Sequence, residues 1–162
     1  MAAIDLAGLL RCLEVTETTP GSWTAPNLEM DYHRIFGGQL LAQAIMLATA
    51  TTEDRTIRSL GCLFPREGSL DKPFSFEIES SQTGRTFATR RISAEQDGRP
   101  FFLAQASLHV PEGGPEHQEP APDVGDPTDA APEEMTMTPW ATRVARAEAR
   151  RVGPERRAPW RP

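Results

Sequence analysis

Two consecutive glycines, Gly37 and Gly38, open an uncharged run of mostly good helix formers that extends to Thr52. A glycine pair at a helix start lets the backbone approach a bound carbonyl group, and the first amides of a helix have no partner within it. These amides and the positive end of the helix dipole could stabilise charge developing on a carbonyl oxygen. Gly37, Gly38 and Gln39 are therefore candidate contacts for such an oxygen. Alternatively, the glycines only permit close helix-to-sheet packing and a tight entry turn.

Acid–base chemistry has few candidates near this helix. The helix contains no Asp or Glu, so a base would have to come from elsewhere. Asp31 and His33 precede the helix and could act as base and orienter, although such a pair is more often a solvated turn or a cap. Gln39 and Gln43 share a helix face and could hydrogen-bond a water or a carbonyl, or serve the structure alone.

Length and composition limit the chain to one ordinary domain. Its 162 residues, 38% of them hydrophobic, suffice for one core. Cys12 and Cys62 lack metal-ligand spacing, so we expect two reduced thiols, with no metal and no cofactor. No apolar run could span a bilayer, and no signal-peptide pattern is present. We therefore expect a cytoplasmic protein without a membrane segment.

The net charge of −6 is unevenly distributed along the chain. Residues 1–110 carry −3, residues 111–135 carry −8 with no base, and residues 136–162 carry +5 with seven Arg. The second segment is also rich in Pro, which favours an unpacked linker. We expect a globular domain over 1–110, a linker over 111–135 and a largely disordered tail over 136–162. Clustered Arg could contact phosphates, but we expect no nucleic-acid partner.

The pattern of the remaining segments predicts an α+β fold. Residues 4–13 have helical spacing, and a Pro20-Gly21 pair indicates a turn between two short strands. Apolar residues cover most of the circumference of the long helix, as expected if a sheet wraps around it and buries it. Strand character follows in four stretches: residues 56–64, 74–82, 85–96 and 99–110. Together these elements predict a curved antiparallel sheet folded around one helix.

Alternation and turn chemistry support the last three strands. Phe74, Phe76 and Ile78 share one face of their strand. Gln82-Thr83-Gly84 and Asp97-Gly98 are expected to close two hairpins, and a DG pair is among the strongest hairpin signals. Near and beyond the last strand, His109 and His117 are interpreted as surface residues.

Three colinear blocks resemble the N-terminal half of the type II, double hot-dog acyl-CoA thioesterases. They are RIFGGQLLAQA, FPREGSLDKPFSFEIE and GRTFATRRISAEQDGRPFFLAQASLHVPEGGPEHQ. The resemblance implies a single hot-dog fold. Residues 138–152 resemble more loosely the start of the family's second domain, so we expect the tail to represent the beginning of a missing second hot-dog domain.

The resemblance also implies an activity, the hydrolysis of fatty acyl-CoA to free fatty acid and CoA in fatty acid metabolism. In this family the Asp, Ser or Thr, and Gln that activate water come from the second domain, and no carboxylate stands at the matching Gly38 and Gln39. Arg58 and Gly61 also replace the His often found in the following strand. The alternative is a non-catalytic acyl-CoA-binding or structural half that needs a partner domain.

Substrate and partner contacts follow from the same resemblance. The phosphates of CoA favour arginine near the acyl site, and the candidates are Arg34, Arg66, Arg85, Arg90 and Arg91. Arg90 and Arg91 are consecutive on a strand, so at most one of them serves a given pocket. A single hot-dog sheet leaves an open edge strand, and we therefore expect a homodimer or pairing with another hot-dog domain.

Overall fold

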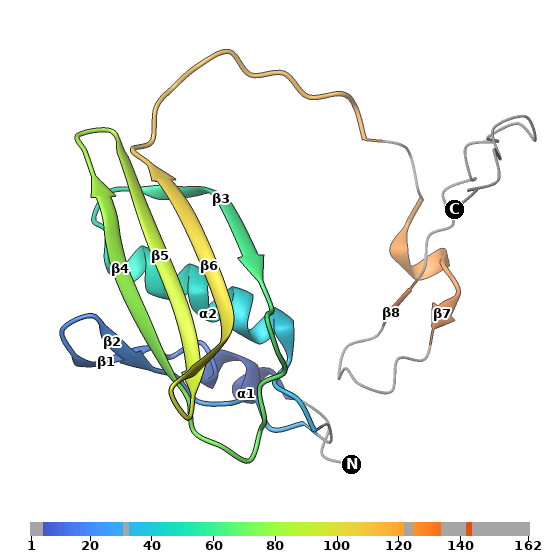
Figure 1. Ribbon diagram of the computed structural model, residues 1–162. Helices are drawn as coiled ribbons and strands as arrows, with labels where there is room; N and C mark the ends of the chain where they lie inside the picture. The colour runs from blue at the N-terminus through green and yellow to red at the C-terminus, as the bar shows by residue number, and fades with distance from the viewer. Residues whose placement is uncertain (1–4, 31–32, 122–124, 134–141, 144–162) are drawn as a thin grey trace, which may run out of the picture. The chain divides into compact units, whose positions relative to one another are not determined.

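A computed structural model describes residues 5–30, 33–121, 125–133 and 142–143. The chain divides into two compact units, Met1–Gly114 and Pro115–Pro162. The first contains two helices and six strands (Figure 1), namely α1 (Leu6–Arg11), β1 (Thr16–Thr19), β2 (Ser22–Thr24), α2 (Gly37–Ala50), β3 (Thr56–Leu63), β4 (Ser75–Thr83), β5 (Phe87–Gln96) and β6 (Arg99–His109). No helix in the described ranges is both long enough and apolar enough to cross a membrane.

The six strands form one antiparallel sheet in the order β1-β2-β4-β5-β6-β3. The long helix α2 lies across one face of this sheet, and the strands β4, β5, β6 and β3 curve over it (Figure 1). The predicted α+β hot-dog fold is confirmed.

The core lies between α2 and the inner face of the sheet. Leu40, Ala44 and Leu47 are buried on α2 and pack in one cluster with Phe76 and Ile92 of the strands. Exposed Ser75 and Glu77 flank buried Phe76, so the predicted alternation on β4 is confirmed.

One side of α2 is not covered by the sheet. Ile45 and Met46 are 43% and 41% exposed, and Leu41 is half-buried. The expectation that the helix is buried around most of its circumference was therefore wrong, because the six strands enclose α2 on only part of its surface. An apolar stripe remains open to a further element.

Two of the predicted turns are confirmed and the third lies later in the chain. Gly21 has a φ of +82° between β1 and β2, while Asp97 and Gly98, with φ of +52° and +69°, join β5 to β6. The turn expected at 82–84 instead occupies 84–86, where Gly84 N donates to Phe87 O at 2.8 Å. A bulge in β4 and hydrogen bonds to Arg90 keep the preceding residues in the strand.

The C-terminal end of α2 is fastened by Arg90, which is 4% exposed. Its Nη2 donates to the carbonyl of the C-cap residue Thr51 at 2.9 Å, and its Nε donates to Thr51 Oγ1 at 3.2 Å. Its Nη1 donates to Ser80 Oγ and Thr83 Oγ1 at 2.9 and 3.1 Å. Burial, and after it the charge of Arg55, lowers the pKa of Arg90. The negative end of the helix dipole offsets part of this guanidinium charge.

The β3–β4 connection packs tightly against the start of α2. Ile35 N donates to Gly68 O at 2.9 Å, and Arg34 forms a β-bridge with Ser69. A Cβ at Gly68 would lie 2.5 Å from Cε2 of buried Phe101 and 3.0 Å from Cδ1 of Ile35. Only glycine fits here without displacing the core.

The second unit contains a 3-10 turn (Pro127–Asp129) and the paired strands β7 (Pro132–Glu133) and β8 (Thr142–Arg143). Asp126 Oδ1 accepts from Thr128 N at 2.7 Å, and hydrogen bonds from Thr128 lower the pKa of this carboxyl group. Apart from residues 142–143, the expected tail over 136–162 lies outside the described residues.

We expect Gly68→Ala to destabilise the first unit by about 1–3 kcal/mol, the usual cost of overpacking a close-packed core. The matched control is Gly61→Ala on the edge strand, where nothing lies within 4 Å of an added Cβ. Urea unfolding monitored by circular dichroism compares the two variants. Equal stability of Gly68→Ala and Gly61→Ala would contradict the packing argument.

We expect Arg90→Met to destabilise the unit by about 2–4 kcal/mol, because it leaves several buried acceptors without a donor. The neighbouring Arg91→Met should cost less than about 1 kcal/mol, because both side chains of the Arg91–Glu79 pair are exposed to solvent. Urea midpoints measure the difference. A smaller loss for Arg90→Met than for Arg91→Met would rule out Arg90 as the fastening of α2.

Candidate functional site at the start of helix α2

The helix α2 begins without a side-chain cap. Phe36 is the N-cap residue and makes no capping hydrogen bond, while its carbonyl accepts from Gln39 N at 3.0 Å and Leu40 N at 3.4 Å. Among the described residues, the amides of Gly37 and Gly38 have no acceptor. Two adjacent N–H groups at the positive end of a four-turn helix can bind an anionic or partly anionic oxygen.

Two aromatic rings stand beside these glycines. A Cβ on Gly37 would lie 3.3 Å from Cζ of Phe64, and one on Gly38 would lie 2.5 Å from Cε1 of Phe36. The two Phe side chains are about half exposed, and Phe64 also contacts buried Phe102 with ring centroids 5.3 Å apart. The glycines thus allow close aromatic packing and leave their amides beside an apolar, solvent-facing rim. Neither ring was singled out by sequence, because an exposed Phe is indistinguishable there from a core Phe.

Gln39 and Gln43 are committed to internal hydrogen bonds. Gln39 is 3% exposed; its Oε1 accepts from Leu28 N at 3.0 Å and its Nε2 donates to Asn27 Oδ1 at 3.0 Å. Gln43 Nε2 donates to Cys12 O at 2.7 Å and to Pro26 O at 3.0 Å. These bonds attach the segments before α2 to its flank. The second Nε2 hydrogen of Gln39 is directed to Gln43 Oε1 at 3.4 Å, and its backbone amide donates to Phe36 O. Gln39 therefore keeps no donor for the predicted substrate contact, and the candidate site reduces to Gly37 and Gly38.

Two candidate arginines lie at this end of α2, Arg34 just before the helix and Arg66 on the connection between β3 and β4. Arg34 Nη1 pairs with Glu67 Oε1 at 2.9 Å, and Arg34 Nε donates to His33 Nε2 at 2.8 Å. Arg66 is exposed on the adjoining segment and makes no hydrogen bond or ion pair within the described ranges. Asp31, the expected companion of His33, lies outside the described residues.

The other candidate arginines lie elsewhere. Arg90 is at the opposite end of α2, about 20 Å along a helix of this length, and its donors are bonded within the fold. Arg85 is exposed in the β4–β5 turn, and Arg91 pairs with Glu79 on the outer face of the sheet. The structure therefore brings Arg34 and Arg66, but not Arg85, Arg90 or Arg91, near Gly37 and Gly38. A phosphate contact for Arg90 stays a prediction without support from its geometry.

The two histidines of the C-terminal segment differ in burial. His117 is exposed, as predicted. His109 is only 6% exposed, so its placement on the surface was wrong. It lies at the end of β6 between β5 and β3, where its ring packs edge-on against the ring of Phe87 with centroids 4.3 Å apart. Neither residue lies in the element that contains Gly37 and Gly38.

A depression of about 710 Å³ lies on the outer face of the sheet, lined by small and polar residues such as Ser59, Gly61, Ser93 and Gln105. Of the candidate residues only Arg91 lines it. Within the described ranges no group of three or more His, Cys, Asp or Glu could hold a metal ion. Burial raises the pKa of the Cys12 thiol, whose Sγ donates to Leu9 O at 3.0 Å.

The arrangement supplies two hydrogen-bond donors, the amides of Gly37 and Gly38, which could stabilise negative charge on a carbonyl oxygen. The charge of Arg34 is paired with Glu67, while Arg66 is exposed on the adjoining segment. His33, the candidate base described near the helix start, accepts a hydrogen bond from Arg34 Nε through its Nε2. Activation of a water would also require a general base.

Comparison with known proteins identifies the family. A family model described as the acyl-CoA thioesterase N-terminal domain matches residues 25–109. Human acyl-coenzyme A thioesterase 8 is 38% identical over 96 residues, covering 58% of this chain and 30% of that protein. Acyl-CoA thioesterase 2 of Haemophilus influenzae is 29% identical over 133 residues, covering 82% and 46%. The solved tesB protein of Mycobacterium avium subspecies paratuberculosis is 29% identical with a TM-score of 0.72, covering 78% and 50%.

The chain spans 30–49% of the length of the curated relatives compared with it. The matched region, residues 25–109, includes α2 and every strand from β3 to β6, and it therefore contains the helix start, the aromatic rim and both nearby arginines. The chain belongs to the acyl-CoA thioesterase family and carries its N-terminal domain.

Proposed function

We propose that this domain takes part in the hydrolysis of fatty acyl-CoA to free fatty acid and CoA. The observation that carries the proposal is the start of α2, where two adjacent amides that have no acceptor among the described residues lie beside an apolar rim. The family match adds the substrate class, since the relatives are named acyl-CoA thioesterases.

In the proposed reaction, water adds to the thioester carbonyl carbon and the carbonyl oxygen gains negative charge. The Gly37 and Gly38 amides donate to this oxygen, and the helix dipole favours its charge. The C–S bond then breaks, the sulfur leaves as the CoA thiolate and is protonated, and the carbonyl carbon keeps the oxygen from water. Arg34 and Arg66 are proposed to attract the CoA phosphates.

The proposal includes a partner hot-dog domain, either a second copy of this chain or another chain. Strand β3 is the sheet edge opposite β1, and most of its residues are exposed. The uncovered stripe on α2 with Ile45 and Met46, together with exposed Leu63 on β3, adds apolar surface that a partner could cover. A partner would pair with the edge, cover the stripe and bring the base that activates water.

A second candidate function is a non-catalytic acyl-CoA-binding or structural half. It is favoured by one observation, the absence of any Asp or Glu on α2. Such a half would bind acyl-CoA through the same amides without hydrolysing it. We also propose a cytoplasmic location and a role in fatty acid metabolism, where acyl-CoA would be available.

We expect Gly38→Pro to lower kcat for a medium-chain acyl-CoA by about 10²–10³-fold, the usual loss when one oxyanion donor is removed. Proline is tolerated in the first turn of a helix, where the lost N–H has no helical acceptor. Gly38→Ala is the matched control: it adds a Cβ but keeps the N–H, and the exposed Phe36 ring can move aside. Release of free thiol measures turnover, and circular dichroism checks the helix.

Three outcomes separate the candidates. Turnover that survives Gly38→Pro contradicts the oxyanion role. Equal losses in Gly38→Pro and Gly38→Ala indicate that crowding against Phe36, rather than the amide, is responsible. Saturable acyl-CoA binding without turnover by the unmodified chain favours the non-catalytic half.

We expect the chain to form a stable dimer at micromolar concentration, because the open edge and the α2 stripe need cover. Ile45→Glu should shift the protein to monomer in sedimentation velocity experiments by placing a charge in the interface. Gln105→Glu, on the outer face of β6, should leave the dimer intact. A monomeric unmodified chain that also fails to associate with a second hot-dog domain would refute this partner model.

A further inference from the structure

One side chain, Gln96 at the end of β5, holds the β3–β4 connection at three points. Its Oε1 accepts from Ser69 N at 2.9 Å, while its Nε2 donates to Ser69 O at 2.7 Å and to Lys72 O at 2.9 Å. The side-chain amide thus satisfies a backbone donor and two backbone acceptors, as a neighbouring strand would.

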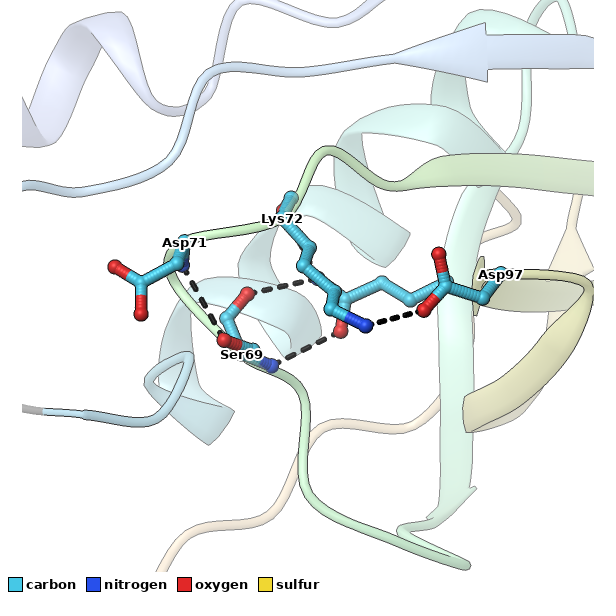
Figure 2. Close-up of polar contacts among 5 residues, drawn as sticks. Ser69, Asp71, Lys72 and Asp97 are labelled. Carbon is cyan, nitrogen blue, oxygen red and sulfur yellow. Dashed lines mark hydrogen bonds and ion pairs between the residues drawn. The ribbon is translucent and has the colours of Figure 1, made fainter.

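Two further contacts accompany the Gln96 hydrogen bonds. Lys72 Nζ pairs with Asp97 Oδ2, and Asp71 N donates to Ser69 Oγ at 3.3 Å (Figure 2). Asp97 lies in the β5–β6 turn, immediately after Gln96. The Lys72–Asp97 pair is exposed and adds little by itself, so on the β5 side the Gln96 amide makes the stronger contribution to holding the connection.

A short series of contacts connects the Gln96 hydrogen bonds to the start of α2. Ser69 forms its bridge with Arg34, and the preceding Gly68 accepts from Ile35 N at 2.9 Å. Ile35 is followed by Phe36, the N-cap residue that has no capping bond of its own. Because α2 lacks a side-chain cap, its first residues take their position from the segment before them.

The packing of Gly68 against the core limits how far Ser69 and Gly68 can move. Gly68 lies against Phe101, where even a methyl group would meet the ring at 2.5 Å. A shift of Ser69 would therefore move Gly68 along the ring or break its bond to Ile35. Close-packed interiors transmit such shifts instead of absorbing them.

We propose that Gln96 is a positioning residue for the proposed thioester site: by fixing Ser69 and Gly68 it sets Ile35 and hence the direction of the Gly37 and Gly38 amides. The catalytic consequence rests on the proposed function, whereas the structural consequence does not. Within the described residues the side-chain hydrogen bonds of Gln96 go to the connection and not to the helix, and we propose that it acts through the connection.

Hydrogen exchange and amide chemical shifts of the full chain test the structural step. Gln96→Glu is the principal variant, because it keeps the shape and the acceptor but removes both donors. Gln96→Ala removes all three bonds. In both variants we expect the Ile35 amide to exchange about 10-fold faster or more, and the Gly37 and Gly38 amide shifts to move.

Gln105→Glu and Gln105→Ala are the matched controls, since Gln105 is exposed on β6 and its side chain makes no hydrogen bond within the described residues. Amides in the centre of β5 and β6 report global unfolding. Unchanged Ile35 exchange and Gly37 and Gly38 shifts in the Gln96 variants would overturn the proposal. An equal acceleration at Ile35 and in the strand centres would also overturn it, because the effect would then be global.

Turnover gives the second arm of the test. If acyl-CoA is hydrolysed, the Gln96 variants should lose about 10-fold or more in kcat with nearly unchanged KM, since the amides act mainly on the transition state. Absence of turnover in the unmodified chain counts against the proposed function and leaves the exchange result to decide the role of Gln96. Full kcat in Gln96→Glu would refute its positioning role in catalysis.

Discussion

Every part of the first unit depends on how the sheet holds one uncharged helix. The helix α2 has no capping side chain at its start and no charged residue in either terminal turn. Its own side chains therefore do not stabilise either end of the helix. Its ends are fixed by groups from distant strands. Arg90 binds the Thr51 carbonyl at the C-terminal end, while the β3–β4 connection holds Ile35 before the N-terminal end.

These two fastenings leave the helix start available for chemistry. A side-chain cap at Phe36 would bind an amide of the first helical turn. The hydrogen bond from Ile35 N to Gly68 O instead fixes the backbone just before the helix and uses none of the amides of the first turn. The flank is secured in the same way, because Gln39 and Gln43 bond to preceding segments. The helix is thus rigidly held while Gly37 and Gly38 keep their donors.

The same sheet covers α2 incompletely, which connects the fold to its proposed partner. Ile45 and Met46 face away from the strands, and β3 ends the sheet with an open edge. These two features support the proposed pairing with another hot-dog domain. In the proposed function, one partner domain would supply both the cover and the base.

Sequence alone determined the element order, the Asp97-Gly98 turn, the alternation of β4 and the glycine pair, because these depend on local periodicity and backbone preference. It could not distinguish Arg90, bonded inside the fold, from Arg66, exposed near the helix start, since both are simply arginines next to turns or strands. It also gave no role to Gln96. Hydrogen bonds between segments 24 or more residues apart exist only once the sheet has closed over α2, and that closure decided which polar groups serve the fold and which stay available.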